Sequence, residues 1–191
     1  AREERWLARS VYKLEEIDRK ARLIRSGDRI LDLGCYPGSW SQYSVLKVGP
    51  KGEVVGVDLK SPDRFSSPRF RFIEADVLSL DGAWLRKQVG MRDLVISDLA
   101  PATSGISVTD TSRSIELARR ALEIALAVLK TGGHFLCKVF EGSEVKAFRT
   151  ELASHFAKVQ THRPSAVRKA SREIYLLATR RTSEAGSPQG P

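Results

Sequence analysis

Short apolar runs with the composition of β-strands recur along the chain, and several are separated by segments with helical periodicity. Strands are predicted at 29–34, 53–58, 70–74, 93–97, 134–140, 157–162 and 173–179. Helices are predicted at 10–25, 40–48, 112–130 and 144–154. Strands that alternate with helices favour a mainly parallel sheet with helices on both faces. The sequence therefore predicts one α/β domain over residues 1–181, and the composition of residues 182–191 is typical of a disordered tail.

The helix at 112–130 has the clearest pattern, because its apolar residues share one half of the helical surface. We expect Thr131-Gly132-Gly133 to end this helix. For the helix at 10–25, Ser10 is the expected N-cap and Ser26-Gly27 the expected stop.

Unusual residues follow three of the predicted strands. The loop from Asp32 to Trp40 (DLGCYPGSW) follows the first strand, Asp58 ends the second and Asp76 comes after the third. In open α/β sheets, ligands bind beyond the carboxyl ends of the strands. Gly34 and Gly38 would let the backbone approach a ligand closely. Asp58 is placed to bind the two hydroxyls of a ribose, and Asp76 to reach an adenine amine.

A dinucleotide-binding fold would show a similar pattern, so its glycine signature has to be compared. That signature needs a glycine in the middle of G-x-G-x-x-G to make room for a pyrophosphate. Here Tyr36 and Pro37 occupy this part of the loop. The loop therefore favours a cofactor without a pyrophosphate over NAD, and a tight turn without any ligand is the remaining alternative.

Four charged residues stand where such residues are costly or unexpected. Lys13 lies at the edge of the apolar stripe of its helix, and Lys138 lies inside an apolar strand. Asp98 follows the strand 93–97, and Glu173 begins the last strand. An antiparallel last strand would bring Glu173 to the same edge as the other three. Each residue alone has an ordinary interpretation, as a lysine that reaches past the core to water, a structural ion pair or an exposed charge.

Together, five segments resemble the FtsJ (RrmJ) family of RNA ribose 2′-O-methyltransferases. They are Ser10-Val-Tyr-Lys13, Asp32–Gln42, Ser97-Asp98-Leu-Ala-Pro101, Cys137-Lys138 and Ser171-Arg-Glu173. The match keeps its order from about Arg9 to Thr179, which is nearly the whole chain. Cys35-Tyr36 and Ser39 depart from the small residues that are usual in the family's cofactor loop.

The resemblance implies a Rossmann-like class I methyltransferase fold with a mainly parallel seven-stranded sheet and an antiparallel last strand. It also implies S-adenosylmethionine as cofactor, S-adenosylhomocysteine as product and a Lys13, Asp98, Lys138 and Glu173 catalytic set. The cofactor contacts that it implies are Asp32, Gly34, Pro37, Gly38, Ser39, Trp40, Asp58, Asp76 and Asp98. Lys138 would accept the proton of a ribose 2′-hydroxyl, because burial and a nearby Lys13 favour its neutral form. No metal is expected, since His134, His155 and His162 are scattered.

The charge of the chain agrees with a polyanionic substrate. The net charge is +9, and residues 158–181 hold seven Lys and Arg against one Glu. Arg163, Arg168, Lys169 and Arg172 are therefore expected to bind RNA phosphates. The resemblance points to a uridine of large-subunit (23S) ribosomal RNA, with transfer RNA, a messenger-RNA cap or non-catalytic RNA binding as alternatives.

The sequence also bears on where the protein is located and whether it forms oligomers. The first residues are charged, unlike a secretory signal, and no apolar run is long enough to span a membrane. Cys35 and Cys137 are too few for a disulfide framework. We therefore expect a cytoplasmic protein without membrane contact, and a monomer.

Overall fold

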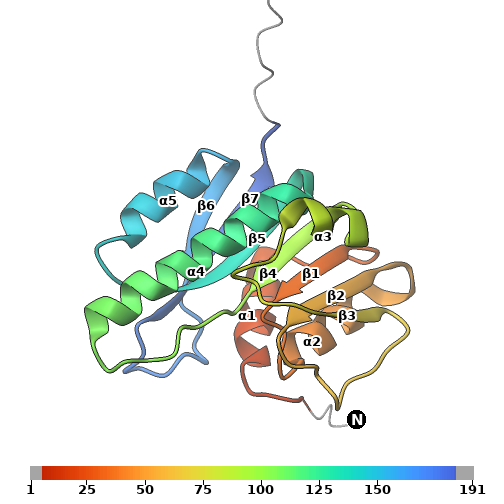
Figure 1. Ribbon diagram of the computed structural model, residues 1–191, viewed down its shortest axis with the longest axis horizontal. Helices are drawn as coiled ribbons and strands as arrows, with labels where there is room; N and C mark the ends of the chain where they lie inside the picture. The colour runs from red at the N-terminus through yellow and green to blue at the C-terminus, as the bar shows by residue number, and fades with distance from the viewer. Residues whose placement is uncertain (1–5, 184–191) are drawn as a thin grey trace, which may run out of the picture.

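The computed structural model describes residues 6–183, whose strands form one seven-stranded sheet in the order β3–β2–β1–β4–β5–β7–β6 (Figure 1). The strands are β1 (Arg29–Leu33), β2 (Glu53–Asp58), β3 (Phe70–Glu74), β4 (Arg92–Ser97), β5 (Leu129–Phe140), β6 (Phe156–His162) and β7 (Glu173–Arg181). From residue 184 on, the predicted tail lies outside the described residues.

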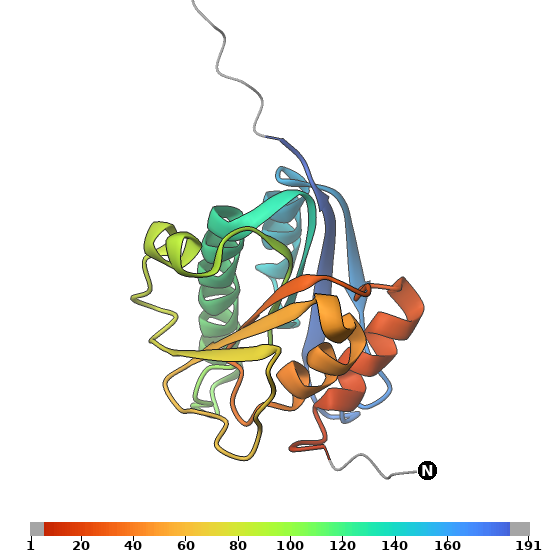
Figure 2. The same ribbon diagram turned by 90° about the vertical axis from the view of Figure 1, so that its right-hand side faces the viewer.

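Helices cover both faces of this sheet. They are α1 (Val11–Ala21), α2 (Ser39–Val48), the short 3₁₀ helix η1 (Gly49–Lys51), α3 (Gly82–Val89), α4 (Ser107–Val128) and α5 (Val145–Ala153). Figure 2 shows α1 and α2 on one side of the sheet and α3, α4 and α5 on the other. The predicted α/β architecture with helices on both faces is therefore confirmed.

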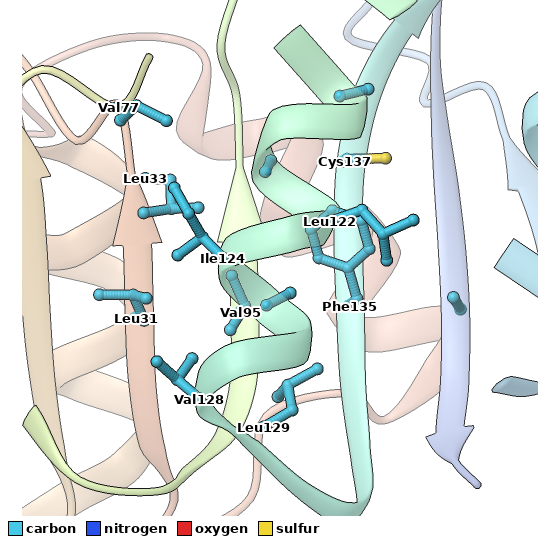
Figure 3. Close-up of a cluster of buried hydrophobic side chains, with 14 of the residues drawn as sticks. Leu31, Leu33, Val77, Val95, Leu122, Ile124, Val128, Leu129, Phe135 and Cys137 are labelled. Atoms are coloured by element: carbon cyan, nitrogen blue, oxygen red, sulfur yellow. The ribbon is translucent and has the colours of Figure 1, made fainter. Parts of the chain in front are cut away.

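Each face of the sheet has its own apolar core. Under α4, Leu122, Ile124 and Val128 pack against Leu31 of β1 and Phe135 of β5, among other buried residues (Figure 3). Under α1 and α2, the second core joins Leu14, Ile17 and Trp40 to alternate residues of β4 and β7. Strands buried on both faces explain why the central runs are almost wholly apolar.

The last strand runs against all the others, as predicted. β7 pairs antiparallel with β5 on one side and with β6 on the other, and Glu173 lies opposite Phe140. The start of β7 therefore meets the carboxyl ends of the parallel strands. This direction decides that Glu173 lies at the same edge as Asp98 and Lys138.

The first helix is shorter than predicted. Ser10 holds the N-cap position, as predicted, although its backbone is helical and its side chain caps no amide. The helix ends at Ala21, because Arg22 takes a left-handed conformation with φ 50°. The carboxylate of Asp18, buried in the last turns, then accepts a hydrogen bond from the Ile24 amide at 2.7 Å. The apolar stripe continues to Ile24 although the helix does not.

The boundaries around α4 also differ from the prediction. The helix begins five residues earlier, at Ser107, and ends at Val128. Thr131-Gly132-Gly133 does not cap it, because the chain enters β5 directly at Leu129. The helix α3, whose Asp81 N-cap accepts a hydrogen bond from the Trp84 amide at 2.7 Å, was missed. It is only eight residues long, too short for a clear apolar period.

Candidate active site

The structure brings the four predicted catalytic residues together at the carboxyl edge of the sheet. Lys13 comes from α1, Asp98 follows β4, Lys138 lies near the end of β5 and Glu173 begins β7. Lys13 Nζ is 2.7 Å from Glu173 Oε1, and Lys138 Nζ is 3.4 Å from Asp98 Oδ1. Their side chains are between 10% and 19% exposed, so they form a recessed site that solvent still reaches.

Tyr175 joins the two ion pairs and was missed in the sequence. Its hydroxyl is 2.7 Å from Asp98 Oδ1 and also contacts Glu173 Oε1. Tyr175 lies two residues after Glu173, on the same face of β7, and directly opposite Lys138 of β5. The alternation of side chains along a strand could have identified Tyr175 from the sequence, because it places Tyr175 on the same face as Glu173, which was already a predicted site residue.

The Tyr175 hydroxyl cannot donate hydrogen bonds to both carboxylates at once. A phenol has one hydrogen, so it can donate to only one of the two carboxylates at a time. Burial raises the pKa of the Tyr175 hydroxyl, and both carboxylates raise it further, so the phenol keeps its proton at neutral pH. The result is a continuous chain of contacts from Lys13 through Glu173, Tyr175 and Asp98 to Lys138.

The two carboxylates differ in their electrostatics. Burial raises the pKa of Asp98, although Lys138, Tyr175 and Lys13 act against this rise. Burial acts in the same direction on Glu173, but the hydrogen bonds from Lys13 and Tyr175 outweigh it and lower the pKa of Glu173. Asp98 is thus the carboxylate that takes up a proton more readily as the pH falls.

The glycine loop predicted for the cofactor lies beside this site, because Leu33 at the end of β1 pairs with Ser97 at the end of β4. Gly34 has φ +75° and Gly38 φ +114°, which favour glycine. A Cβ at Gly38 would also lie 2.9 Å from Pro62 Cβ. Both predicted turn glycines are therefore required by the backbone.

Asp32 is the buried acid under this loop. Its side chain is 1% exposed, Ser41 Oγ donates a hydrogen bond to Oδ2 at 2.7 Å, and Oδ1 has no hydrogen-bond partner among the described residues. Burial raises the pKa of Asp32 to about 7, against the effect of the Ser41 hydrogen bond. A buried acceptor without a partner is costly unless a ligand satisfies it.

Asp58 and Asp76 lie at the ends of neighbouring strands, as expected. Asp58 Oδ2 accepts a hydrogen bond from the Tyr36 amide at 2.8 Å, and Oδ1 accepts one from the Leu59 amide at 2.7 Å. Asp76 Oδ1 accepts one from the Leu78 amide at 2.9 Å. Asp58 therefore fixes the glycine loop as well as standing at its rim.

Ser39 and Trp40, which are also predicted to contact the cofactor, contact the N-terminal segment through their side chains. Ser39 Oγ lies 3.1 Å from Ser10 Oγ, and Trp40 Nε1 donates to the Ser10 carbonyl at 3.0 Å. The Trp40 ring also packs against Tyr175, with 5.8 Å between ring centroids. These contacts join the glycine loop to the segment that carries Lys13. Pro37, another predicted cofactor contact, follows Tyr36 in the loop through a cis peptide bond.

The four predicted RNA-binding residues separate into two pairs. Arg163 is 3.0 Å from Glu141, and Arg172 donates to the Glu141 carbonyl at 2.6 Å, so both hold neighbouring segments together. Arg168 and Lys169 are exposed, and their side chains have no hydrogen-bond or ion-pair partner among the described residues. Only this second pair is free to bind phosphates without giving up a contact.

A groove of about 780 Å³ opens beside Lys13 and Glu173. It is lined by Arg9, Ser10, Tyr12, Lys13, Ala166, Arg168, Ala170, Ser171 and Glu173. In residues 6–183, no cluster of three or more His, Cys, Asp or Glu could hold a metal ion. Within the same range, no helix combines the length and apolar character needed to cross a membrane.

Comparison with known proteins gives consistent matches along almost the full length. A family profile described as "FtsJ-like methyltransferase" matches residues 6–181. The chain is 45% identical over 180 residues to a "Ribosomal RNA large subunit methyltransferase E" from Bdellovibrio bacteriovorus, covering 93% of this chain and 91% of that protein. It is 40% identical over 177 residues to a protein of the same name from Desulfosudis oleivorans, covering 93% and 86%.

Among solved structures, a crystal structure from Plasmodium falciparum, provisionally assigned as a ribosomal RNA methyltransferase, superimposes with a TM-score of 0.83. Its sequence is 28% identical, and the match covers 94% of this chain and 100% of that one.

Proposed function

This chain belongs to the FtsJ-like methyltransferase family and is an enzyme, and from that premise we propose that it methylates a ribose 2′-oxygen of large-subunit ribosomal RNA with S-adenosylmethionine. The observation that carries the proposal is the chain of contacts from Lys13 through Glu173, Tyr175 and Asp98 to Lys138. It gathers two amines and two carboxylates in one recess beside the glycine loop. Such a site can align a hydroxyl group and take up its proton.

The residues under the glycine loop fit S-adenosylmethionine. The buried Asp32 Oδ1 lacks a partner, and the ammonium group of the cofactor's methionine part would supply one. Gly34 and Gly38 give the loop the two left-handed turns that its course requires. Asp58 can still accept from ribose hydroxyls, because each carboxylate oxygen has two lone pairs, and Asp76 stands at the next strand end for the adenine. Bound there, the cofactor would supply a methyl group activated by its sulfonium.

The catalytic roles follow from the contacts of each residue. Lys138, next to Asp98, takes up the proton of the 2′-hydroxyl when the amine is neutral. Asp98 orients Lys138 and offsets positive charge near the sulfonium. Glu173 holds Lys13 at 2.7 Å, and the role that we propose for this second amine is to orient the ribose. Tyr175 keeps both carboxylates in place.

The substrate assignment rests on two supports. The two relatives described above have large-subunit ribosomal RNA in their names. Their matches to this chain cover 91% and 86% of their own lengths. Arg168 and Lys169 add exposed positive charge near the active edge, where phosphate contacts would position RNA without reading its sequence. We further propose a uridine as the target, and one domain over residues 1–181 that acts as a monomer in the cytoplasm.

The test is methylation of large ribosomal subunits that lack the modification, with S-adenosylmethionine labelled in the methyl group. We expect label on one ribose 2′-oxygen of the subunit RNA, and none with Lys138→Ala. Transfer RNA and capped messenger RNA serve as competing substrates in parallel reactions. Transfer to either of these and not to the subunit would overturn the substrate, and no transfer to any RNA would overturn the activity.

A further inference from the structure

The groove beside Lys13 has one aromatic residue among its lining residues. Tyr12 is 46% exposed, and none of the described residues forms a hydrogen bond with its hydroxyl or a ring contact with it. It lies on α1 next to Lys13, whose amine reaches Glu173. An exposed, unpartnered ring in a groove that leads to a catalytic lysine needs an explanation other than packing.

The walls of the groove are fixed before any ligand binds. Glu16 of α1 accepts hydrogen bonds from the Ser165 amide at 2.7 Å and from Ser165 Oγ at 3.0 Å. Val167 is only 8% exposed and belongs to the core under α1 and α2. These contacts hold the segment before β7 against α1. The volume of about 780 Å³ lies in the range of about 300–1,000 Å³ that is usual for small-molecule sites.

The chemistry of the lining matches a nucleotide. Tyr12 offers a flat apolar face, and Ala166 and Ala170 leave space beside it. Arg9 and Arg168 supply positive charge at the same groove, whereas the charge of Glu173 is already balanced by Lys13. Aromatic rings that stack on bases, accompanied by basic residues that bind phosphates, are the usual means of holding single-stranded RNA.

We propose that this groove is a nucleobase-binding subsite in which Tyr12 stacks on an unpaired base of the RNA substrate. The inference rests on the proposed function for the identity of the base. A 2′-oxygen at the catalytic amines belongs to a ribose whose neighbouring carbon, C1′, carries the base. The base of the methylated nucleotide is therefore the one nearest to a ring adjacent to Lys13. The substrate class is then single-stranded RNA with its target base turned out of any helix.

The test is a binding cycle between a protein variant and the removal of the bases. Fluorescence anisotropy measures the Kd of a short uridine oligoribonucleotide and of a strand of equal length made of abasic ribosides, with S-adenosylhomocysteine present. The wild-type protein should bind the abasic strand about 10- to 100-fold more weakly, which is the usual effect of losing one stacked base. Tyr12→Ala should bind both strands alike and match the weaker value. Tyr12→Phe should behave as wild type, because the ring is what acts.

Trp84→Ala is the matched control, since Trp84 is also 46% exposed and lies on α3, on the other side of the sheet. This variant should keep the full preference for the strand with bases. Thermal unfolding and S-adenosylhomocysteine affinity should be unchanged in Tyr12→Ala, because the residue is exposed on a helix where alanine is favoured. A Tyr12→Ala protein that still prefers the strand with bases would overturn the subsite. The binding readout does not depend on methyl transfer, so it separates this inference from a failure of the proposed activity.

Discussion

Asp32→Asn would measure the cost of the buried carboxyl under the glycine loop. Burial raises the pKa of Asp32 from its ordinary 3.8 to about 7. In the unfolded chain the pKa returns to the ordinary value, so between about pH 4 and pH 7 the folded protein binds more protons. Stability therefore decreases as the pH rises through this window and is level above it. Asparagine has no titrating proton and keeps an oxygen that can accept the hydrogen bond of Ser41.

The size of the effect follows from the shift. One pKa unit corresponds to about 1.4 kcal/mol, so the full shift of about three units corresponds to about 4 kcal/mol. About 2–3 kcal/mol of this falls between pH 5 and pH 8. The assay is urea unfolding of both proteins across that range. The free energy of unfolding of the wild type minus that of Asp32→Asn should decrease by this amount as the pH rises.

The comparison is between slopes, because the amide that replaces Oδ1 adds an offset that does not change with pH. A difference that stays constant from pH 5 to pH 8 would refute the reasoning, since Asp32 would then have an ordinary pKa. A second arm tests the ligand. If the cofactor's ammonium pairs with the Asp32 carboxylate, S-adenosylhomocysteine affinity should fall as the pH decreases below about 7 in the wild type and stay level in Asp32→Asn.

Three further predictions concern the active edge. Lys138→Ala should lower kcat by at least about 100-fold and leave S-adenosylhomocysteine affinity unchanged in calorimetry, since general-base contributions are typically of that size; equal turnover would move the base elsewhere. Tyr175→Phe removes the hydroxyl whose proton lowers the pKa of whichever carboxylate it binds, Asp98 or Glu173. The acidic limb of the pH–rate profile should therefore move to higher pH, and an unmoved limb would contradict this role. The double variant Arg168→Ala, Lys169→Ala should reduce the slope of log affinity for RNA against log salt concentration by up to about 1.5. The control Lys87→Ala, at an exposed position on α3, should leave this slope unchanged. An unchanged slope in the double variant would mean that the RNA binds elsewhere.

The sequence predicted the parts of the site that a local pattern can show. The acids at strand ends and the lysine inside an apolar strand stand out because they break a simple pattern. Asp98 and Glu173 could be assigned to one edge once the last strand was taken as antiparallel. The direction of that strand was the step on which the whole site depended.

Other features depend on the three-dimensional arrangement. Tyr175 looks like any aromatic residue of a buried strand until Asp98 is placed beside its hydroxyl. The side chains of Ser39 and Trp40 contact Ser10, which is about thirty residues away in the sequence. The helix α1 ends at the left-handed Arg22, and the buried carboxylate of Asp18 holds the chain that follows, so the apolar stripe does not mark the end of the helix. Arg163 and Arg172 carry the same charge as Arg168, and only their contacts with Glu141 distinguish them.

The position of β7 has a consequence for biosynthesis. β6 is made before β7, yet within the described sheet β7 is its only neighbour, so β6 has no partner until the last strand leaves the ribosome. The same strand supplies Glu173, which is 160 residues away from the Lys13 that it contacts. A nascent chain that lacks β7 therefore exposes an unpaired strand and lacks the carboxylate that pairs with Lys13. Synthesis of β7 therefore completes the described sheet and brings Glu173 to Lys13 in the same event.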